Sequence, residues 1–336
     1  MRIDPAPLLP PFVAALLPYR RGIARVETDA LHFVDEGARA DRAQTAVLLF
    51  HGNPTWSFLW RHVIAQLLAA EGCERVRVIA PDLLGLGLSD KPRSPSTHTV
   101  ALHVSRMHTL VEGMLEGTDA RGRVIVVGQD WGGPIGAGVA KELEARRPGS
   151  VASMLFANTS VLVPARPFRP KAFHRFSQTP VISDLVFRGL GFPVFSPSRL
   201  GLAGVQGDRS SISGDVARAY RFPLRHLVDR AAPVGLARMV PDAEAHPSVP
   251  RLDEIGRFVE AFERPIGLVW GERDPILGRA LERHVRTLGR ALGGPAFVDR
   301  TSAGHFLQEE VPELLAARIA ELARGTHDGH GARASA

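Results

Sequence analysis

Cysteine and long apolar runs are what this 336-residue sequence lacks most clearly. Cys73 is the single cysteine, which excludes an internal disulfide framework and cannot form a zinc site by itself. No reactive signature surrounds Cys73, so we expect an inert, partly buried thiol. No apolar run is long enough to suit a bilayer span. Hydrophobic residues make up 45% and charged residues 23% of the chain, a balance typical of soluble globular proteins.

Clustered charge is also missing. The formal net charge of +6 comes from 41 Lys and Arg against 35 Asp and Glu, and the arginines are scattered along the chain. Binding along nucleic-acid phosphates needs clustered Lys and Arg, so we expect a solvated, arginine-rich surface and no nucleic-acid partner. The N-terminal residues 1–22 have an apolar centre interrupted by prolines, and no small-residue cleavage site follows. This pattern predicts an arm that packs on the core, and the cytoplasm is the default location.

Short aliphatic runs alternate with longer helical patterns, which predicts an α/β fold. Continuous apolar runs bounded by Gly, Pro and Asp are typical of strands buried on both faces, so we expect a mostly parallel central sheet flanked by helices. The predicted strands are residues 46–50, 75–80, 123–128, 153–158, 265–270 and 295–299.

A region rich in Pro, Phe and Arg interrupts this alternation at residues 159–233. This composition predicts several short helices joined by turns, and we expect an inserted helical cap. The core domain would then comprise 1–158 and 234–323. Residues 324–336 are small and polar, and we expect a disordered tail.

The stretch GQDWGG, residues 128–133, lies between a predicted strand and a predicted helix. In the related pattern G-x-S-x-G, a serine nucleophile sits on a sharp turn above the sheet, and the next residue donates its backbone N–H to an oxyanion. Asp130 occupies that position here. Because Asp at such a turn is also a good helix N-cap, this motif alone leaves both interpretations open.

Three further motifs follow predicted strands. His51, Gly52 and Asn53 come after the first of these strands, at the loop that supplies the second oxyanion N–H in this type of fold. Asp274 and His305 follow the last two strands. The chain order Asp130, Asp274, His305 is the nucleophile, acid, base order of α/β-hydrolases, so the predicted fold class is an α/β-hydrolase fold with an inserted cap.

At these residues the sequence resembles the haloalkane dehalogenases. The stretches that carry the resemblance are HGNPTWSFLWR, PDLLGLGLSDKP, GQDWGG, WGERDP and GHFLQEEVPE. HGNPT together with QDWGG is specific, whereas PDLLGLGLSDKP is common to many α/β-hydrolases. The match is weakest at the two termini and in the cap.

The resemblance implies an enzyme that converts a haloalkane and water to a primary alcohol and a halide ion, through an alkyl ester on Asp130. It makes His305 the base, Asp274 the acid and the side chains of Asn53 and Trp131 the halide donors. The backbone N–H groups of Asn53 and Trp131 would bind the oxyanion. No metal or organic cofactor is implied. The acid at Asp274 and the absence of a cap tryptophan resemble the third dehalogenase subfamily.

Other functions of the same fold remain open at this point. An epoxide hydrolase uses the same Asp and His, but it needs two cap tyrosines, and the chain has only Tyr19 and Tyr220. Fluoroacetate dehalogenases resemble this chain in mechanism but carry Arg in place of Trp131. A luciferase-like or non-catalytic ligand-binding relative is a further alternative. Apolar cap residues could line a pocket, although we expect most of them to pack in the core: Phe168, Phe173, Phe176, Phe187, Leu190, Phe192 and Phe195.

Overall fold

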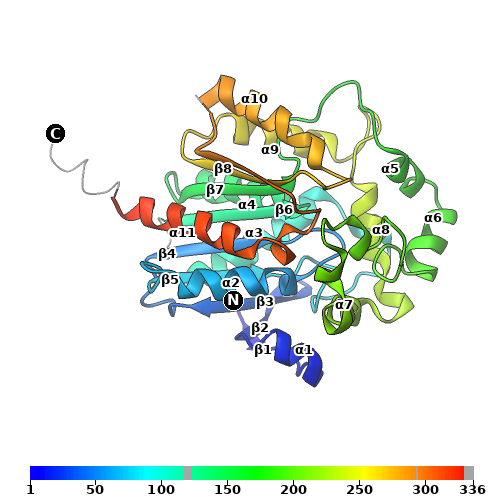
Figure 1. Ribbon diagram of the computed structural model, residues 1–336, viewed down its shortest axis with the longest axis horizontal. Helices are drawn as coiled ribbons and strands as arrows, with labels where there is room; N and C mark the ends of the chain where they lie inside the picture. Colours follow the sequence, from blue (N-terminus) through cyan, green and yellow to red (C-terminus); the bar gives the residue numbers. More distant parts are fainter. Residues whose placement is uncertain (117, 119–122, 293, 329–336) are drawn as a thin grey trace.

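The computed structural model describes residues 1–116, 118, 123–292 and 294–328. Within these residues the strands form one sheet in the order β1-β2-β3-β5-β4-β6-β7-β8-β9, which runs through the centre of the molecule (Figure 1). The strands from β5 to β9 in this order are parallel. They are β4 Thr45–Phe50, β5 Val76–Pro81, β6 Val124–Asp130, β7 Val151–Thr159, β8 Ile266–Gly271 and β9 Phe297–Thr301.

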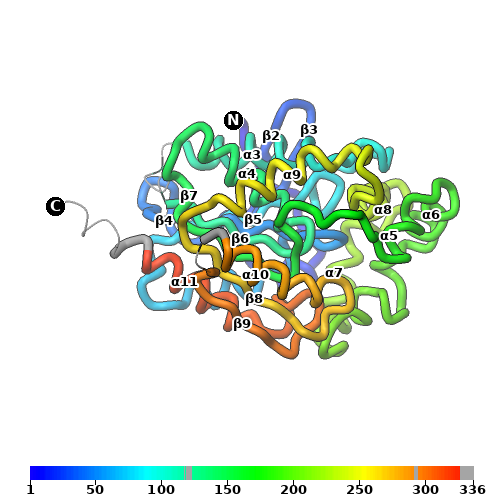
Figure 2. Tube along the Cα trace, turned by 90° about the horizontal axis from the view of Figure 1, so that it is seen from above, coloured from blue at the N-terminus to red at the C-terminus, as the bar shows by residue number. Residues whose placement is uncertain are grey.

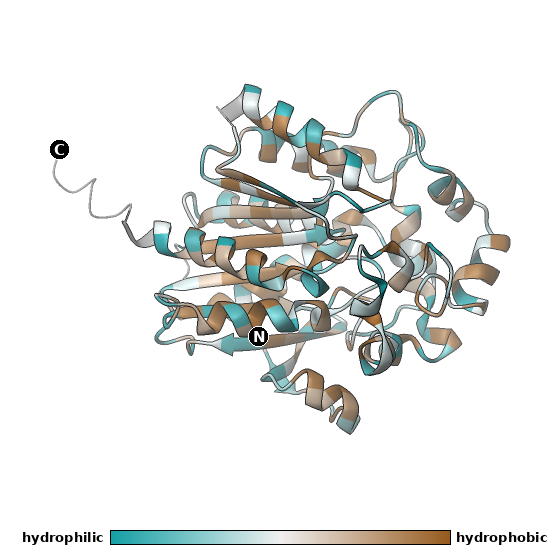
Figure 3. Cartoon of the chain, in the orientation of Figure 1, coloured by the Kyte–Doolittle hydropathy of each residue, from teal (hydrophilic) through white to brown (hydrophobic). Residues whose placement is uncertain are grey.

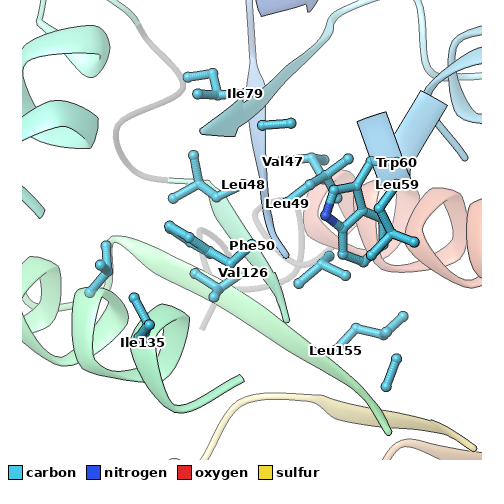
Figure 4. Packing of buried hydrophobic residues seen from close by; sticks show 14 of the residues in the cluster. Val47, Leu48, Leu49, Phe50, Leu59, Trp60, Ile79, Val126, Ile135 and Leu155 are labelled. Atoms are coloured by element: carbon cyan, nitrogen blue, oxygen red, sulfur yellow. The ribbon is translucent and has the colours of Figure 1, made fainter. Parts of the chain in front are cut away.

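These parallel strands lie where the aliphatic runs predict strands. Every residue of β4, β5 and β8 is buried, as expected for strands covered by helices on both faces. Val47, Leu49 and Phe50 of β4 pack among Trp60, Val126 and Leu155 (Figure 4). The apolar colour of the central strands contrasts with the mixed colouring of the surrounding helices (Figure 3).

Three strands near the N-terminus extend the sheet and were not predicted from the sequence. They pair antiparallel with one another, and β3 pairs antiparallel with β5. In β2 buried residues alternate with half-buried or exposed ones, so the sequence has no continuous apolar run there. The bounds of these strands are β1 Ile3–Pro5, β2 Arg21–Val26 and β3 Asp29–Gly37.

Helices cover both faces of the sheet. On one face α2 packs against α11, and on the other α4 packs against α3 and α9 (Figures 1 and 2). The N-terminal arm forms the short helix α1, in which Val13 is buried. The bounds are α1 Pro11–Leu16, α2 Arg61–Ala69, α3 Val100–Leu115, α4 Gly132–Arg146, α9 Val249–Glu260, α10 Leu281–Leu292 and α11 Pro312–Asp328. No helix in the described part of the chain is long and apolar enough to cross a membrane.

Short helices between β7 and α9 gather at one end of the molecule (Figure 1). They include α5 Ala172–Ser177, α6 Ile182–Asp184, α7 Gly214–Arg221 and α8 Ala231–Arg238. The boundary expected at residue 233 falls inside α8, which packs against α5 and α6. At the other boundary, α11 continues to Asp328, so residues 324–328 are helical and do not form the expected tail. The remainder of that predicted tail lies outside the described residues.

Candidate active site

The turn after β6 places Asp130 at the carboxyl end of the central strand. Its backbone has φ of 51°, in the left-handed region that non-glycine residues rarely adopt. The backbone packs tightly here, because a Cβ on Gly132 would lie 2.1 Å from the carbonyl oxygen of Phe50. Trp131, and not Asp130, is the N-cap residue of α4, and no side chain caps that helix. The geometry is therefore that of a largely buried side chain on a sharp elbow, and the N-cap interpretation of Asp130 is wrong.

Backbone donors converge on the Asp130 carboxylate. The N–H of Asn53 donates to Oδ1 over 2.7 Å, and the backbone N–H of Trp131 also hydrogen-bonds to the carboxylate. Asn53 can approach this closely because residue 52 is glycine, where a Cβ would lie 2.4 Å from Oδ1 of Asp130. The backbone N–H groups of both residues that the sequence suggests for an oxyanion site thus contact the Asp130 carboxylate.

His305 lies between two carboxylates from different strand ends. Its Nδ1 is 2.9 Å from Oδ2 of Asp274, and its Nε2 is 3.7 Å from Oδ2 of Asp130. The backbone N–H of Ile276 donates to the other oxygen of Asp274 over 2.7 Å. Parallel strands end at the same edge of a sheet, so residues that follow β6, β8 and β9 meet although they are distant in sequence. The structure brings the three predicted residues together.

The two titrating groups of this arrangement have shifted pKa values. Burial raises the pKa of Asp130, against the opposing effects of His305 and of the backbone N–H groups of Asn53 and Trp131. Burial by itself lowers the pKa of His305, but the charge and hydrogen bond of Asp274, together with Asp130, outweigh it and the pKa is raised. Shifted pKa values at a cavity are typical of catalytic sites.

A cavity of about 120 Å³ opens above Asp130. Asn53, Asp130, Trp131 and His305 line its floor, and most of the remaining wall is apolar. Trp131 lines this cavity and is only partly buried, so its side chain is accessible to a ligand there. Asn53 is only partly available, because its Nδ2 donates to the carbonyl of Pro233 in α8 over 2.9 Å. One N–H of that amide remains for the predicted halide site.

The cap phenylalanines divide between the cavity and the interior. Phe173 lines the cavity above Asp130, and Phe168 lines an adjoining cleft that also reaches Asp130 and Trp131. Phe187 and Phe192 pack with Phe173 and Phe176 in a separate small core within the cap. Most of these residues therefore pack against one another, as expected.

Several residues that the sequence motifs did not single out also support this site. The side-chain amide of Gln129 donates to the carbonyl of His305 over 3.1 Å. Asn158, at the end of β7, donates to the carbonyls of Gly304 and His305 and accepts from the N–H of Gly271. A cap lysine, Lys171, donates to the carbonyls of Pro275 and Ile276 beside Asp274. Gln129 adjoins the nucleophile position in the sequence, which is the one signal that could have found it.

Neither tyrosine reaches the cavity. Tyr220 of α7 is buried and donates to Oε1 of Glu309, which also forms an ion pair with Arg61. Tyr19 donates to the backbone carbonyl of Arg61. Both hydroxyl groups are therefore used to hold the protein together, which disfavours an epoxide hydrolase. Within the described residues, no group of three or more His, Cys, Asp or Glu side chains could hold a metal ion.

Comparisons with known proteins show which family this chain is similar to. The model of the α/β hydrolase family matches residues 47–318. A haloalkane dehalogenase of Mycobacterium marinum (strain ATCC BAA-535 / M) is 34% identical over 293 residues, covering 86% of this chain and 87% of the relative. Haloalkane dehalogenase 2 of Mycobacterium bovis (strain ATCC BAA-935 / AF2122/97) is 33% identical over 325 residues, covering 96% of this chain and 99% of the relative.

Solved structures share the fold. The haloalkane dehalogenase DbeA from Bradyrhizobium elkani USDA94 matches with a TM-score of 0.75 at 24% identity, and the match covers 92% of this chain and 99% of that one. The predicted α/β-hydrolase fold is thus confirmed. With an aspartate on the nucleophile elbow and curated relatives of this identity over most of its length, the chain belongs to the haloalkane dehalogenase family of α/β hydrolases.

Proposed function

We propose that this chain hydrolyses haloalkanes to an alcohol and a halide ion, and that Asp130 carries the covalent intermediate. The observation that supports this most is a carboxylate on the elbow, within 3.7 Å of a histidine that is itself paired with a second carboxylate. A carboxylate can displace halide from an sp³ carbon and form an alkyl ester. A serine would instead form an ether, which water could not hydrolyse afterwards.

In the first half-reaction one oxygen of Asp130 attacks the carbon, and the carbon–halogen bond breaks with its electron pair leaving on the halide. Oδ1 is already bound by the N–H of Asn53, so we assign the attack to Oδ2 and the future ester carbonyl to Oδ1. The indole N–H of Trp131 and the remaining amide N–H of Asn53 would bind the departing halide. Neutral donors suit this role in an apolar cavity, because they need no buried counter-charge.

In the second half-reaction Nε2 of His305 takes a proton from water while the water oxygen attacks the ester carbonyl. The backbone N–H groups of Asn53 and Trp131 would stabilise the oxyanion that forms on Oδ1. When this intermediate collapses, the bond from the carbonyl carbon to the alkyl oxygen breaks, and that oxygen takes the proton from His305 and leaves as the alcohol. The carboxyl group of Asp130 then loses its proton to solvent, which restores the carboxylate. Asp274 keeps the proton of His305 on Nδ1 and stabilises the imidazolium.

The proposal also assigns the chain to the third dehalogenase subfamily and includes an inserted cap that begins at residue 159 and ends within α8. It further places the protein in the cytoplasm, which cell fractionation would test.

Bromide release from 1,2-dibromoethane and 1-bromobutane tests the activity. The wild-type protein should release bromide and form alcohol, and Asp130→Asn should release none. Asn also adopts the left-handed backbone region readily, so this variant should keep the elbow. If the wild-type protein releases no more bromide than Asp130→Asn, the proposal is wrong.

Intact-protein mass spectrometry tests the residue roles. His305→Phe should keep the nucleophile but lose the base, so after reaction with 1-bromobutane it should gain the mass of a butyl group. Asp130→Asn/His305→Phe is the matched control and should gain no mass. An adduct that persists in the double variant would place the nucleophile elsewhere.

A further inference from the structure

A segment of the cap, residues 205–208, lies directly against the loop that carries His305. The backbone N–H of His305 donates to the carbonyl of Val205 over 2.9 Å. The side-chain amide of Gln206 then pairs with the next residue, because its Oε1 accepts from the N–H of Phe306 over 2.9 Å and its Nε2 donates to the carbonyl of Phe306 over 3.1 Å. The cap thus binds the backbone N–H of His305 and both backbone polar groups of the next residue, Phe306.

Glu310, on the core side, binds both residues 205–208 and the loop that carries His305. Its Oε1 accepts from the N–H groups of Gly207 and Gly304, at 3.0 and 2.9 Å, and its Oε2 accepts from the N–H of Asp208 at 2.8 Å. One carboxylate therefore joins the cap segment to the residue that precedes His305. Hydrogen bonds to a charged acceptor are stronger than those between neutral groups.

The packing leaves this contact no free space. A Cβ on Gly304 would lie 2.4 Å from the Cα of Gln206 and from the backbone nitrogen of Gly207. Gln206 is buried, with 7% of its surface exposed. Val205 also lines the cavity above Asp130. The wall of the substrate cavity and the support of the base are therefore the same segment of chain.

We propose that Gln206 is a positioning residue for the base, and that Glu310 supports it; this inference rests on the proposed function. His305 acts only in the second half-reaction, since the attack of Asp130 on the haloalkane needs no base. Displacement of the histidine loop should therefore slow ester hydrolysis and leave alkylation intact. Gln206 touches neither substrate nor reacting atoms, and it acts through the backbone at Phe306.

The test separates the two half-reactions of Gln206→Met, which keeps the side-chain length but has no amide. With 1-bromobutane in single-turnover experiments, the bromide burst should stay within about twofold of wild type, whereas alcohol formation should slow about tenfold to a hundredfold. The butyl adduct should accumulate on Gln206→Met and be visible by intact mass. Gln178→Met is the matched control, because Gln178 is a cap glutamine whose amide donates to the carbonyls of Arg238 and Val240, away from His305.

Other results overturn the inference. If both steps of Gln206→Met match wild type, or both fall in the same proportion, the residue has no positioning role. Circular dichroism shows whether Gln206→Met is folded. If it is not, the rates of the bromide burst and of alcohol formation are measured for Glu310→Gln, and these two rates decide the question. A wild-type protein that releases bromide while neither variant accumulates adduct overturns this inference alone. A wild-type protein that releases no bromide overturns the proposed function, and this inference with it.

Discussion

Nε2 of His305 lies 3.7 Å from Oδ2 of Asp130, beyond hydrogen-bonding distance, whereas Nδ1 of the same ring lies 2.9 Å from Asp274. The ring is therefore bound on one side only by a carboxylate, which favours the tautomer with its proton on Nδ1. Nε2 then carries the lone pair, and it lies near Asp130 and 3.3 Å from the side-chain nitrogen of Gln129. This asymmetry is what a base for ester hydrolysis needs.

Replacement of Asp274 by Asn should change the pH dependence of alcohol formation. The reaction needs neutral His305, so its rate rises as the pH passes upward through the pKa of His305. Asp274 raises that pKa against the effect of burial, so its loss should move the midpoint to lower pH. The maximal hydrolysis rate should also fall by about a thousandfold or more. Single-turnover hydrolysis measured across pH gives both values, and a midpoint that stays or rises contradicts the prediction.

Replacement of Trp131 by Phe should slow the first half-reaction. The variant loses the indole N–H but keeps the backbone N–H that contacts Asp130, so alkylation should slow about a hundredfold while ester hydrolysis stays near wild type. The bromide burst and the decay of the adduct measure the two steps. Trp56→Phe is the control, because Trp56 is buried outside the cavity. Equal slowing of both steps in Trp131→Phe would contradict a halide-binding role.

Tyr220→Phe should reduce stability without reducing catalysis. The hydroxyl of Tyr220 donates to Glu309, which is paired with buried Arg61 at 2.5 Å. Its loss leaves that carboxylate one donor short, which should lower the free energy of unfolding by about 1 to 3 kcal/mol. Urea unfolding measures the loss, and bromide release should stay within about threefold of wild type. A large loss of turnover at unchanged stability would instead assign the tyrosine to the chemistry.

His284 should make the protein less stable in mild acid. Its Nδ1 donates to the carbonyl of Ala280, its Nε2 accepts from the N–H of Val161, and burial lowers its pKa to about 4. The unfolded chain therefore binds a proton first as pH falls, so folding stability is lost between the unfolded and folded pKa values. His284 should account for about 2 kcal/mol of the loss between about pH 7 and about pH 5.

Urea unfolding of His284→Gln at the two pH values tests this. From the higher to the lower pH, the free energy of unfolding should fall less for His284→Gln than for wild type. This holds whatever the stability of the variant at neutral pH. His226→Gln is the control at an exposed histidine and should show the wild-type drop. An unchanged drop in His284→Gln would contradict the shift in pKa.

Sequence patterns predicted the parallel strands because these strands are buried on both faces and read as continuous apolar runs. The same rule fails for β2, where half-buried or exposed residues alternate with buried ones. Asp130, Asp274 and His305 could be singled out because Asp130 ends β6 and the other two lie within a few residues of the ends of β8 and β9. The bonds from Gln206 to Phe306 and from Asn53 to Pro233 could not, since they join residues 100 and 180 positions apart. Such contacts depend on how the cap rests on the core.

The positions of the strands along the chain have a consequence for biosynthesis. Asp130 ends β6 in the middle of the sheet, whereas Asp274 and His305 follow β8 and β9, the last strands to be made. Contacts of such high sequence separation form late in folding. A nascent chain would therefore possess the carboxylate of Asp130 well before the imidazole of His305. Enzymatic turnover should accordingly return later than secondary structure when the protein is refolded from denaturant.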